Sequence, residues 1–431
     1  MKSTLTPRLF FLSFAVTSIG AILFLLISQA MGAPSSNEDL LPEFADKPWA
    51  SDLCQSNMTK HTKSVSFFEW HCDVETLKEE AQGSRITNTF SIPSGMMARR
   101  AQFWKRIYTV FDNHEYVLHT SAYPEVIIGF ATAANEKLSR KEVRKQRKHY
   151  RNILKSMDKI SPERWSLSQK NIARAMAHIS DRNKFTKAAN SLRTQRGQKT
   201  FLKDGLAISK KYLPHIKSSF RAEGVPEEIS YIAFVESSFN TRARSKVGAS
   251  GIFQIMPNVG RQYMRVDQKG GIDERNDPIK AGKVAAKIFR ANLRLTKSWP
   301  LAITGYNHGA YGMKRIAKRL GTSDLAVMIE KYHRGTFGFA SKNFYIQFLT
   351  MVSIMENENQ YFETSLSTPV LAYKNHKLKK SRSPKWISKN FNTPMSDIIK
   401  LNPDISSHKL KRNSRLPRNY IIKVANHQRS D

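Results

Sequence analysis

The chain has 431 residues, too many for one ordinary hydrophobic core, and this length predicts two or three domains. Apolar residues make up 40% of the sequence and aromatic residues 10%, which permits real cores. The 70 Lys and Arg residues outnumber the 35 Asp and Glu residues, and the net charge of +35 predicts a polyanionic partner or an anionic surface.

The first residues of the chain indicate export. Lys2 and Arg8 precede an uncharged apolar stretch from Leu9 to Ala30, and small residues follow it before Ala33. This order is typical of a cleaved secretory signal, but about 22 apolar residues can also cross a bilayer as an uncleaved anchor. Residues 1–33 are therefore a signal peptide or an N-terminal anchor. Either way we expect a protein of the periplasm or cell envelope, so nucleic acid, the usual partner of so basic a chain, is not expected.

The next segment contains both cysteines of the chain, Cys54 and Cys72, with seventeen residues between them. In an oxidising compartment the simplest expectation is one disulfide, with a loop-closure benefit of roughly 3 kcal/mol. The competing interpretation is a metal site that uses His61 or His71, but close ligand pairs are missing. We expect neither a metal nor a cofactor.

Residues 34–199 form a region that we expect to be mainly helical, because apolar residues recur at helical spacing from Met96 to Tyr212. Within it, Tyr116–Leu118 and Val126–Phe130 are expected as two short strands. The run Arg140–Arg151 is the sharpest basic cluster. It is either a solvated helix face or a contact for an anionic polymer or lipid, and charge alone does not decide between them.

The stretch from Gly224 to Gly260 contains the candidate catalytic residue. Pro226 and the apolar residues after it predict a buried helix that ends at Glu236, and glycines that permit tight turns follow. Most glutamates at helix ends are solvated. Partial desolvation between an apolar helix and a glycine-rich turn would instead raise the pKa of the Glu236 carboxyl and keep it protonated near neutral pH.

Two further patterns follow this stretch. Asp277 before Pro278 predicts the start of a core helix that continues to Leu295. Near the C-terminus, two short helices are expected between two strands, a β-α-α-β order in about 50 residues. Their expected bounds are Val370–Tyr373, Lys385–Phe391, Met395–Leu401 and Tyr420–Val424.

The region around Glu236 resembles the lytic transglycosylase (SLT) domain of glycoside hydrolase family 23. The residues that carry the resemblance are Glu236, Ser237, Phe239, Asn240, Ser245, Gly248, Ala249, Gly251, Gln254, Met256 and Pro257. A second run resembles the helix that precedes the catalytic helix in membrane-bound transglycosylases of the D type, through Tyr212, Leu213, Pro214, Ile216 and Phe220. The resemblance implies a lysozyme-like α+β catalytic domain over residues 200–362 within a mainly α protein.

The same resemblance implies a function and a set of site residues. The expected substrate is peptidoglycan, cut between N-acetylmuramic acid and N-acetylglucosamine with formation of a 1,6-anhydro ring. Glu236 would be the single general acid and base, because the position of a family glutamate falls on Ser341. The residues expected to hold the site or the sugar are Asn240, Ser245, Gln254, Tyr306, Asn307 and Tyr345.

Residues 369–426 resemble a LysM module, which binds N-acetylglucosamine polymers, mainly through the run Ile398–Pro403. The usual start of that module is missing, so a small basic domain of another role is the alternative. The competing function for the whole chain is a non-catalytic peptidoglycan-binding or scaffold protein. Anionic envelope polymers or the membrane surface are expected as further partners, because of the net charge.

Overall fold

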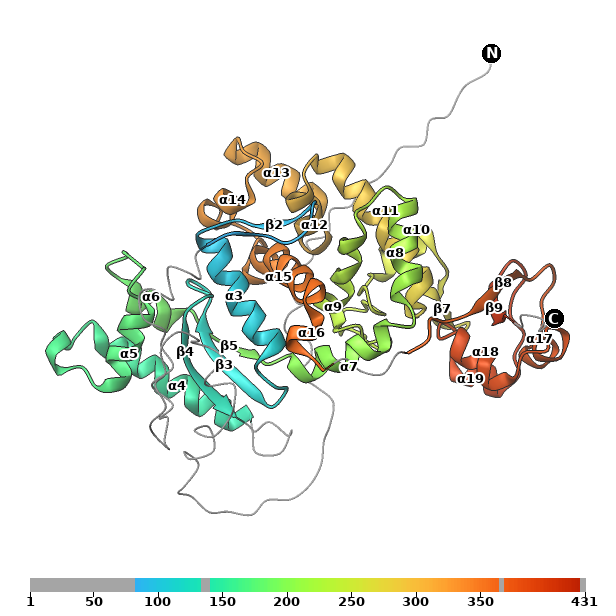
Figure 1. Cartoon of the computed structure of the whole chain (residues 1–431), viewed down its shortest axis with the longest axis horizontal. Helices are drawn as coiled ribbons and strands as arrows, with labels where there is room; N and C mark the ends of the chain where they lie inside the picture. Colours follow the sequence, from blue (N-terminus) through green and yellow to red (C-terminus); the bar gives the residue numbers. More distant parts are fainter. Residues whose placement is uncertain (1–81, 133–139, 364–367, 427–431) are drawn as a thin grey trace, which may run out of the picture.

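A computed structural model describes residues 82–132, 140–363 and 368–426 (Figure 1). The predicted signal peptide or anchor and the Cys54–Cys72 pair lie outside these ranges. Across the described ranges, no helix has both the length and the apolar character needed to cross a bilayer. The prediction of a mainly helical protein is confirmed.

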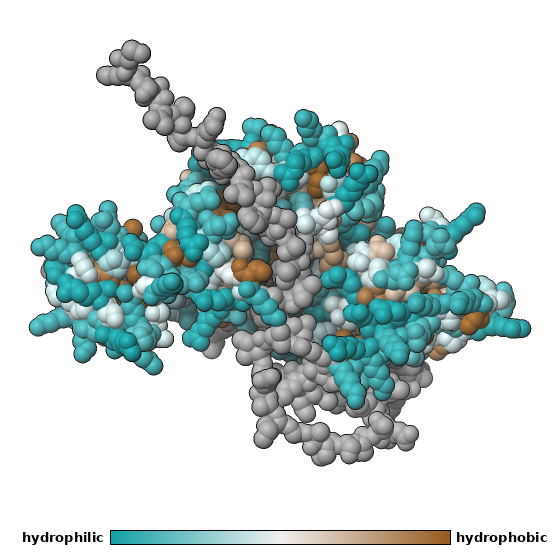
Figure 2. Space-filling model, turned by 180° about the vertical axis from the view of Figure 1, so that it is seen from behind, coloured by the Kyte–Doolittle hydropathy of each residue, from teal (hydrophilic) through white to brown (hydrophobic). Residues whose placement is uncertain are grey.

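Three parts follow one another along the long axis of the molecule in Figure 1. We call them the N-terminal unit (residues 82–198), the central domain (199–363) and the C-terminal module (368–426). The face in Figure 2 is largely hydrophilic, with small and separate hydrophobic patches. This surface agrees with the high content of charged residues.

The N-terminal unit combines helices with a small sheet. Its elements are β1 (Ser84–Arg85), β2 (Ser91–Ile92), α3 (Met96–Thr109), β3 (Glu115–Thr120), β4 (Ile127–Thr132), α4 (Arg140–Met157), η1 (Pro162–Arg164), α5 (Leu167–Ala175), α6 (Lys184–Asn190) and β5 (Leu192–Arg196). The antiparallel sheet has the order β4-β3-β5. The two predicted strands are confirmed as β3 and β4, whereas β5 was not predicted because its sequence, LRTQR, lacks an apolar alternation.

Helix α4 contains the predicted basic run. Tyr150 is buried in a core that this helix shares with the sheet, and Val143 and Ile153 pack partly buried against that core. The side chains of Lys141, Arg144, Lys148 and others on the opposite side are exposed. The helix therefore has an apolar inner side and a basic outer side.

Helix α3 belongs to the core of the central domain, although it precedes that domain by about a hundred residues in sequence. It packs against α15 (Phe339–Glu356), and the adjoining Phe90 ring meets the Phe348 ring edge to face at 5.0 Å. Phe103, Trp104 and Ile107 are buried in the same cluster as the helices of the central domain. The N-terminal unit and the central domain thus share one hydrophobic core.

The other elements of the central domain are mostly helices. They are α7 (Lys199–Ser209), α8 (Leu213–Ala222), η2 (Glu227–Tyr231), α9 (Ile232–Ser237), α10 (Pro257–Tyr263), β6 (Val266–Asp267), β7 (Ile272–Asp273), η3 (Glu274–Asn276), α11 (Pro278–Thr296), α12 (Trp299–His308), α13 (Ala310–Leu320), α14 (Leu325–Lys331) and α16 (Glu358–Tyr361). The helix predicted after Pro226 is a 3-10 turn, η2, followed by the short α9. The predicted start of α11 is confirmed, since the Asp277 side chain accepts hydrogen bonds from the backbone N–H groups of Ile279 and Lys280.

The C-terminal module consists of β8 (Tyr373–Lys377), α17 (Pro384–Asn390), α18 (Met395–Leu401), α19 (Ser407–Lys411) and β9 (Ile421–Ala425). Strands β8 and β9 pair antiparallel around a separate small core. The predicted β-α-α-β order was incomplete, because α19 adds a third helix. The first strand was also placed too early, since it begins where the predicted one ends, at Tyr373.

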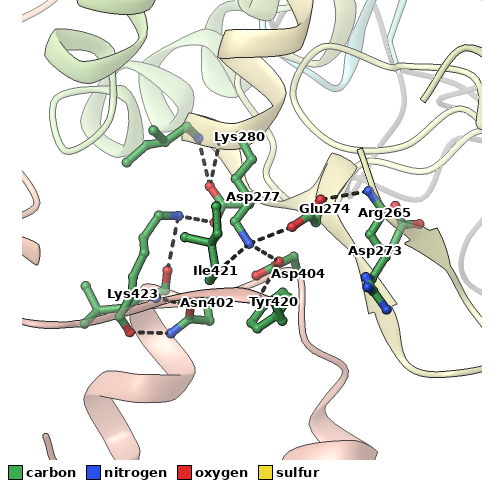
Figure 3. A network of polar contacts seen from close by, with 12 residues as sticks. Arg265, Asp273, Glu274, Asp277, Lys280, Asn402, Asp404, Tyr420, Ile421 and Lys423 are labelled. Atoms are coloured by element: carbon green, nitrogen blue, oxygen red, sulfur yellow. Dashed lines mark hydrogen bonds and ion pairs between the residues drawn. The ribbon is translucent and has the colours of Figure 1, made fainter. Parts of the chain in front are cut away.

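Charged residues hold the C-terminal module against the central domain (Figure 3). Lys280 of α11 donates to the Asp404 carboxylate at 2.8 Å, and Lys423 of β9 contacts the carboxylate of Asp277. A backbone hydrogen bond of 2.9 Å from Ser406 to Gly271 joins the module to the β6–β7 loop. All four charged side chains are largely or completely buried, so this contact is an integral part of the fold.

Candidate active site

Glu236 lies on the last turn of α9, where the backbone leaves the helix abruptly. Ser238 and Phe239 follow with φ angles of 49° and 58°, in the left-handed region. The Ser237 hydroxyl lies 2.9 Å from the carbonyl oxygen of Ile252, which ties the end of α9 to the glycine-rich segment. The carboxyl group is therefore held on a short helix that is anchored at its C-terminal end.

The glycine-rich segment after α9 is held rigidly by the buried Arg275. This side chain donates to the carbonyl oxygens of Gly248 at 2.7 Å and Ile255 at 2.9 Å, and it is paired with Asp273 at 2.7 Å. At Gly251 the φ angle is 76°, and a Cβ atom would lie 1.8 Å from the Arg275 carbonyl oxygen. Only glycine fits that position.

Three of the predicted site residues hold this segment in shape. Ser245 Oγ accepts a 2.9 Å hydrogen bond from the backbone of Ala249, and Gln254 Nε2 donates to Gly251 O at 2.8 Å. Asn240 is exposed, and its side chain accepts from the backbone N–H of Arg242 at 2.9 Å.

A cavity opens beside Glu236. Its lining comes from α9, α12, α15 and the N-terminal unit: Trp104, Tyr108, Gln195, Gln198, Phe234, Val235, Glu236, Ser237, Ser238, Asn307, Ala340, Phe344 and Gln347. Of the seven predicted catalytic and binding residues, Glu236 and Asn307 are in this lining. The amide oxygen of Asn307 accepts a 2.8 Å hydrogen bond from Ser341, the residue at the position of the family glutamate.

The environment of the Glu236 carboxyl favours its neutral form. Burial raises the pKa of Glu236 to about 8, although the residue keeps some exposure to the cavity. It is the single carboxylic acid among the residues that line the cavity. At neutral pH the group is therefore a proton donor, as the sequence predicted from its position.

The two predicted tyrosines are placed differently. The Tyr306 hydroxyl donates to the carbonyl oxygen of Phe253 at 2.8 Å. Burial raises the pKa of Tyr306 well above its ordinary value, and the charge of Glu236 raises it further. Tyr345 is buried, with its ring 6.0 Å from that of Phe348, and neither tyrosine is in the cavity lining. Tyr306 lies near Glu236, behind the wall of the cavity.

Sequence analysis missed the residues that the N-terminal unit contributes to the lining. Trp104 and Tyr108 lie on one side of α3, and Gln195 and Gln198 come from β5 and the loop after it. The spacing of Trp104 and Tyr108, four residues apart in an aromatic helical stretch, was the available signal for a shared helix face. Nothing in that spacing indicated which distant element the face would meet.

The acidic residues of the loop before α11 have structural partners. Asp273 pairs with Arg275 and Glu274 with Lys280 at 3.0 Å, while Asp277 caps α11. In the ranges that the structure describes, no group of three or more His, Cys, Asp or Glu residues is arranged to hold a metal ion.

Comparison with known proteins supports the recognised domain. Residues 215–328, from α8 into α14, match the family model of the transglycosylase SLT domain. Over 164 residues the chain is 26% identical to the membrane-bound lytic murein transglycosylase D of Escherichia coli K12 and to that of E. coli O6:H1 strain CFT073. The match covers 38% of this chain and 35% of each relative, so the chain spans about a third of the length of these curated relatives. The similarity to an SLT domain is thereby confirmed.

Among solved structures, the chain is similar to an inactive mutant of the lytic transglycosylase Slt from Pseudomonas aeruginosa. The identity is 16% and the TM-score 0.29, with 51% of this chain and 33% of that chain covered.

Proposed function

We propose that the chain is a peptidoglycan lytic transglycosylase in which Glu236 acts as both general acid and general base. The observation that carries the proposal is the neutral carboxyl of Glu236, with a pKa of about 8, inside the segment that matches the SLT domain. The named relatives are murein transglycosylases, which supports murein as the substrate.

The proposed reaction needs one carboxylic acid. Glu236 donates its proton to the glycosidic oxygen between N-acetylmuramic acid and N-acetylglucosamine, and the bond from that oxygen to C1 of the muramoyl sugar breaks. The carbonyl oxygen of the substrate's 2-acetamido group attacks C1 in place of a protein nucleophile. The Glu236 carboxylate then removes the proton of the C6 hydroxyl, whose oxygen displaces the acetamido oxygen and closes the 1,6-anhydro ring. No water is consumed, and Glu236 regains its proton.

The other site residues have different roles in this proposal. Asn307, which lines the cavity, would contact the sugar directly through its amide. Ser245 and Gln254 would hold the glycine-rich segment that supports α9. Asn240, which is exposed, is proposed to contribute to a neighbouring sugar subsite. Tyr306 and Tyr345 lie outside the cavity lining and are proposed to support the site from behind its wall.

The remaining parts of the proposal concern the location and partners of the protein. We propose an exported protein that meets peptidoglycan in the periplasm or cell envelope, with residues 1–33 as signal or anchor. The basic outer side of α4 would contact anionic envelope polymers or the membrane surface. Glycan binding by the C-terminal module is proposed through Trp386, which is 38% exposed and has the Arg382 guanidinium 4.2 Å from its ring centroid.

Digestion of purified sacculi followed by mass analysis of the products tests the proposed function. The wild-type chain should release anhydromuropeptides, and Glu236→Gln should release none. Glu228→Gln is the matched control, because Glu228 lies on η2 directly before α9 and is absent from the cavity lining. It should keep full activity.

The other outcomes each point to a different function. Products with reducing ends would make the protein a hydrolase. Activity that persists in Glu236→Gln would overturn the catalytic assignment. Binding to sacculi without any released product would favour the non-catalytic scaffold instead.

A further inference from the structure

The N-terminal unit contributes a wall of the Glu236 cavity, and this wall has a hydroxyl group near the candidate acid. Tyr108 lies in the last turn of α3 and lines the cavity together with Glu236. Burial raises the pKa of Tyr108 and the charge of Glu236 raises it further, in agreement with their places in the lining of one cavity. No hydrogen bond between them is present in the described part of the chain. Because both side chains line the same cavity, one bound ligand can contact both.

We propose that Tyr108 is a substrate-binding residue, whose hydroxyl donates a hydrogen bond to a sugar held between α3 and Glu236. This inference rests on the proposed function, and it adds a binding residue from outside the SLT domain. The match to that domain begins at residue 215, so it does not include α3.

The hydroxyl of Tyr108 can donate a hydrogen bond. Burial raises the pKa of Tyr108 far above its ordinary value, so the phenol keeps its proton at any physiological pH. Gln347 of α15 lines the cavity with Tyr108 and lowers the pKa of its hydroxyl, but by less than burial raises it. The protonated hydroxyl of Tyr108 can therefore donate to a ligand in the cavity.

The lining of the cavity indicates which ligand fits. It combines the aromatic rings of Trp104, Tyr108 and Phe344 with the amides of Gln195, Gln198, Asn307 and Gln347. Aromatic faces and neutral amides suit the apolar ring face and the hydroxyl and acetamido groups of a pyranose. No Lys or Arg is in the lining, although the chain has a net charge of +35. The chemistry therefore favours a neutral sugar, N-acetylglucosamine, over a sugar that presents a carboxylate.

Contacts between residues that are far apart in sequence hold this wall in place. The Trp104 and Tyr108 ring centroids lie 6.2 Å apart. The Trp104 indole also donates a hydrogen bond to Asn343 of α15. The backbone N–H of Gln198 donates to the Ile107 carbonyl oxygen at 2.8 Å. Such a pre-arranged wall binds ligand without a large ordering cost.

Calorimetric titration of the full chain with a soluble oligomer of N-acetylglucosamine tests this inference. Tyr108→Phe should raise the Kd about 3- to 10-fold, the usual effect of one lost hydrogen bond. It should raise the KM for glycan by a similar factor, with kcat and the pH profile little changed. The matched control is Tyr150→Phe, a buried tyrosine in the separate core of the N-terminal unit, which should bind like wild type.

The possible outcomes separate this inference from the proposed function. Equal Kd and KM values for Tyr108→Phe and wild type would overturn the binding role while anhydro products still form. Oligomer binding that depends on Tyr108 without any anhydro product would retain the site and overturn the enzyme. If Tyr108→Phe does not fold, Gln347→Leu replaces it, because Gln347 lines the same cavity and loss of its amide should also weaken binding. Unchanged binding in that variant would refute the inference.

Discussion

The indole Nε1 of Trp104 donates a 3.2 Å hydrogen bond to Oδ1 of Asn343, although 239 residues separate the two in sequence. Both side chains are buried, and the bond joins α3 to α15 beside the Glu236 cavity. Asn343 also donates to the carbonyl oxygen of Phe339 at 2.8 Å, so its amide is fixed from both sides. The placement of the N-terminal wall depends on this contact.

Replacement of Asn343 by leucine should destabilise the fold. Asn343→Leu leaves the buried Trp104 N–H without its acceptor, which should lower the free energy of unfolding by about 1–3 kcal/mol. Urea unfolding followed by tryptophan fluorescence measures this difference. Asn357→Leu is the control, because Asn357 is half-buried directly after the same helix and its side-chain hydrogen bonds are local. It donates to the Ser353 carbonyl oxygen at 2.9 Å and accepts from Gln360 Nε2 at 3.3 Å. Equal losses in the two variants would contradict a specific bond between the helices.

The extent to which this site could be predicted from sequence depends on how local each signal is. Asp277 was recognised as a helix cap, because the capping side chain and the N–H groups it accepts from are within three residues. Glu236 was recognised from a dense motif within one stretch. The wall made by Trp104 and Tyr108 could not be predicted, because it depends on how two helices far apart in sequence pack.

Helix α15 shows how a small shift along a helix changes what a residue contacts. Successive residues of an α-helix differ by about 100° in direction, so neighbours face different surroundings. The family pattern pointed to Tyr345, whereas Phe344 and Gln347 are the residues of this helix that line the cavity with Ala340. Sequence spacing identified the correct helix. It did not identify the side that faces Glu236.

The pH dependence of activity should follow Glu236. With a pKa of about 8, the Glu236 carboxyl is protonated at neutral pH. Above pH 8 it is mostly ionised and can no longer donate a proton. We therefore expect kcat/KM to be level near pH 7 and to fall about tenfold per pH unit above pH 8. Initial rates of anhydro product formation across this range measure it. If kcat/KM already fell as pH rose through 4.5, the ordinary pKa of a glutamate, the Glu236 carboxyl would not be desolvated.

The same carboxyl should make stability depend on pH. Below pH 4.5 Glu236 is protonated in both the folded and the unfolded chain, so Glu236→Gln and wild type should respond alike to pH. Between pH 4.5 and 8 the folded state binds a proton that the unfolded chain releases, and wild type loses stability as pH rises.

The glutamine variant avoids this loss, so its relative stability should grow toward pH 8 by about 4–5 kcal/mol. Unfolding curves at several pH values measure the growing difference. Glu228→Gln controls for the general effect of removing one negative charge. A difference between Glu236→Gln and wild type that stays constant with pH would exclude a raised pKa in the folded protein.

The ion pair between Lys423 and Asp277 should contribute strongly to the joint between the C-terminal module and the central domain. The Lys423 side chain is 3% exposed and that of Asp277 is completely buried, and Asp277 also caps α11. Lys423→Met leaves the Asp277 carboxylate buried without this partner, which should cost about 3–5 kcal/mol. Thermal unfolding of the full chain should show the loss in the central domain as well as in the module, because α11 begins at this pair.

Lys400→Met is the matched control in the same module. Lys400 is 75% exposed and lies 3.8 Å from Asp397, and such surface pairs contribute about 0–1 kcal/mol. We therefore expect Lys400→Met to unfold like wild type. If Lys423→Met were equally mild, the module would be held by its backbone contacts at Gly271 and by Lys280 with Asp404. In that case we expect the C-terminal module to detach from the central domain in the double variant Lys280→Met and Lys423→Met. That variant leaves the buried carboxylates of Asp404 and Asp277 without these lysine partners.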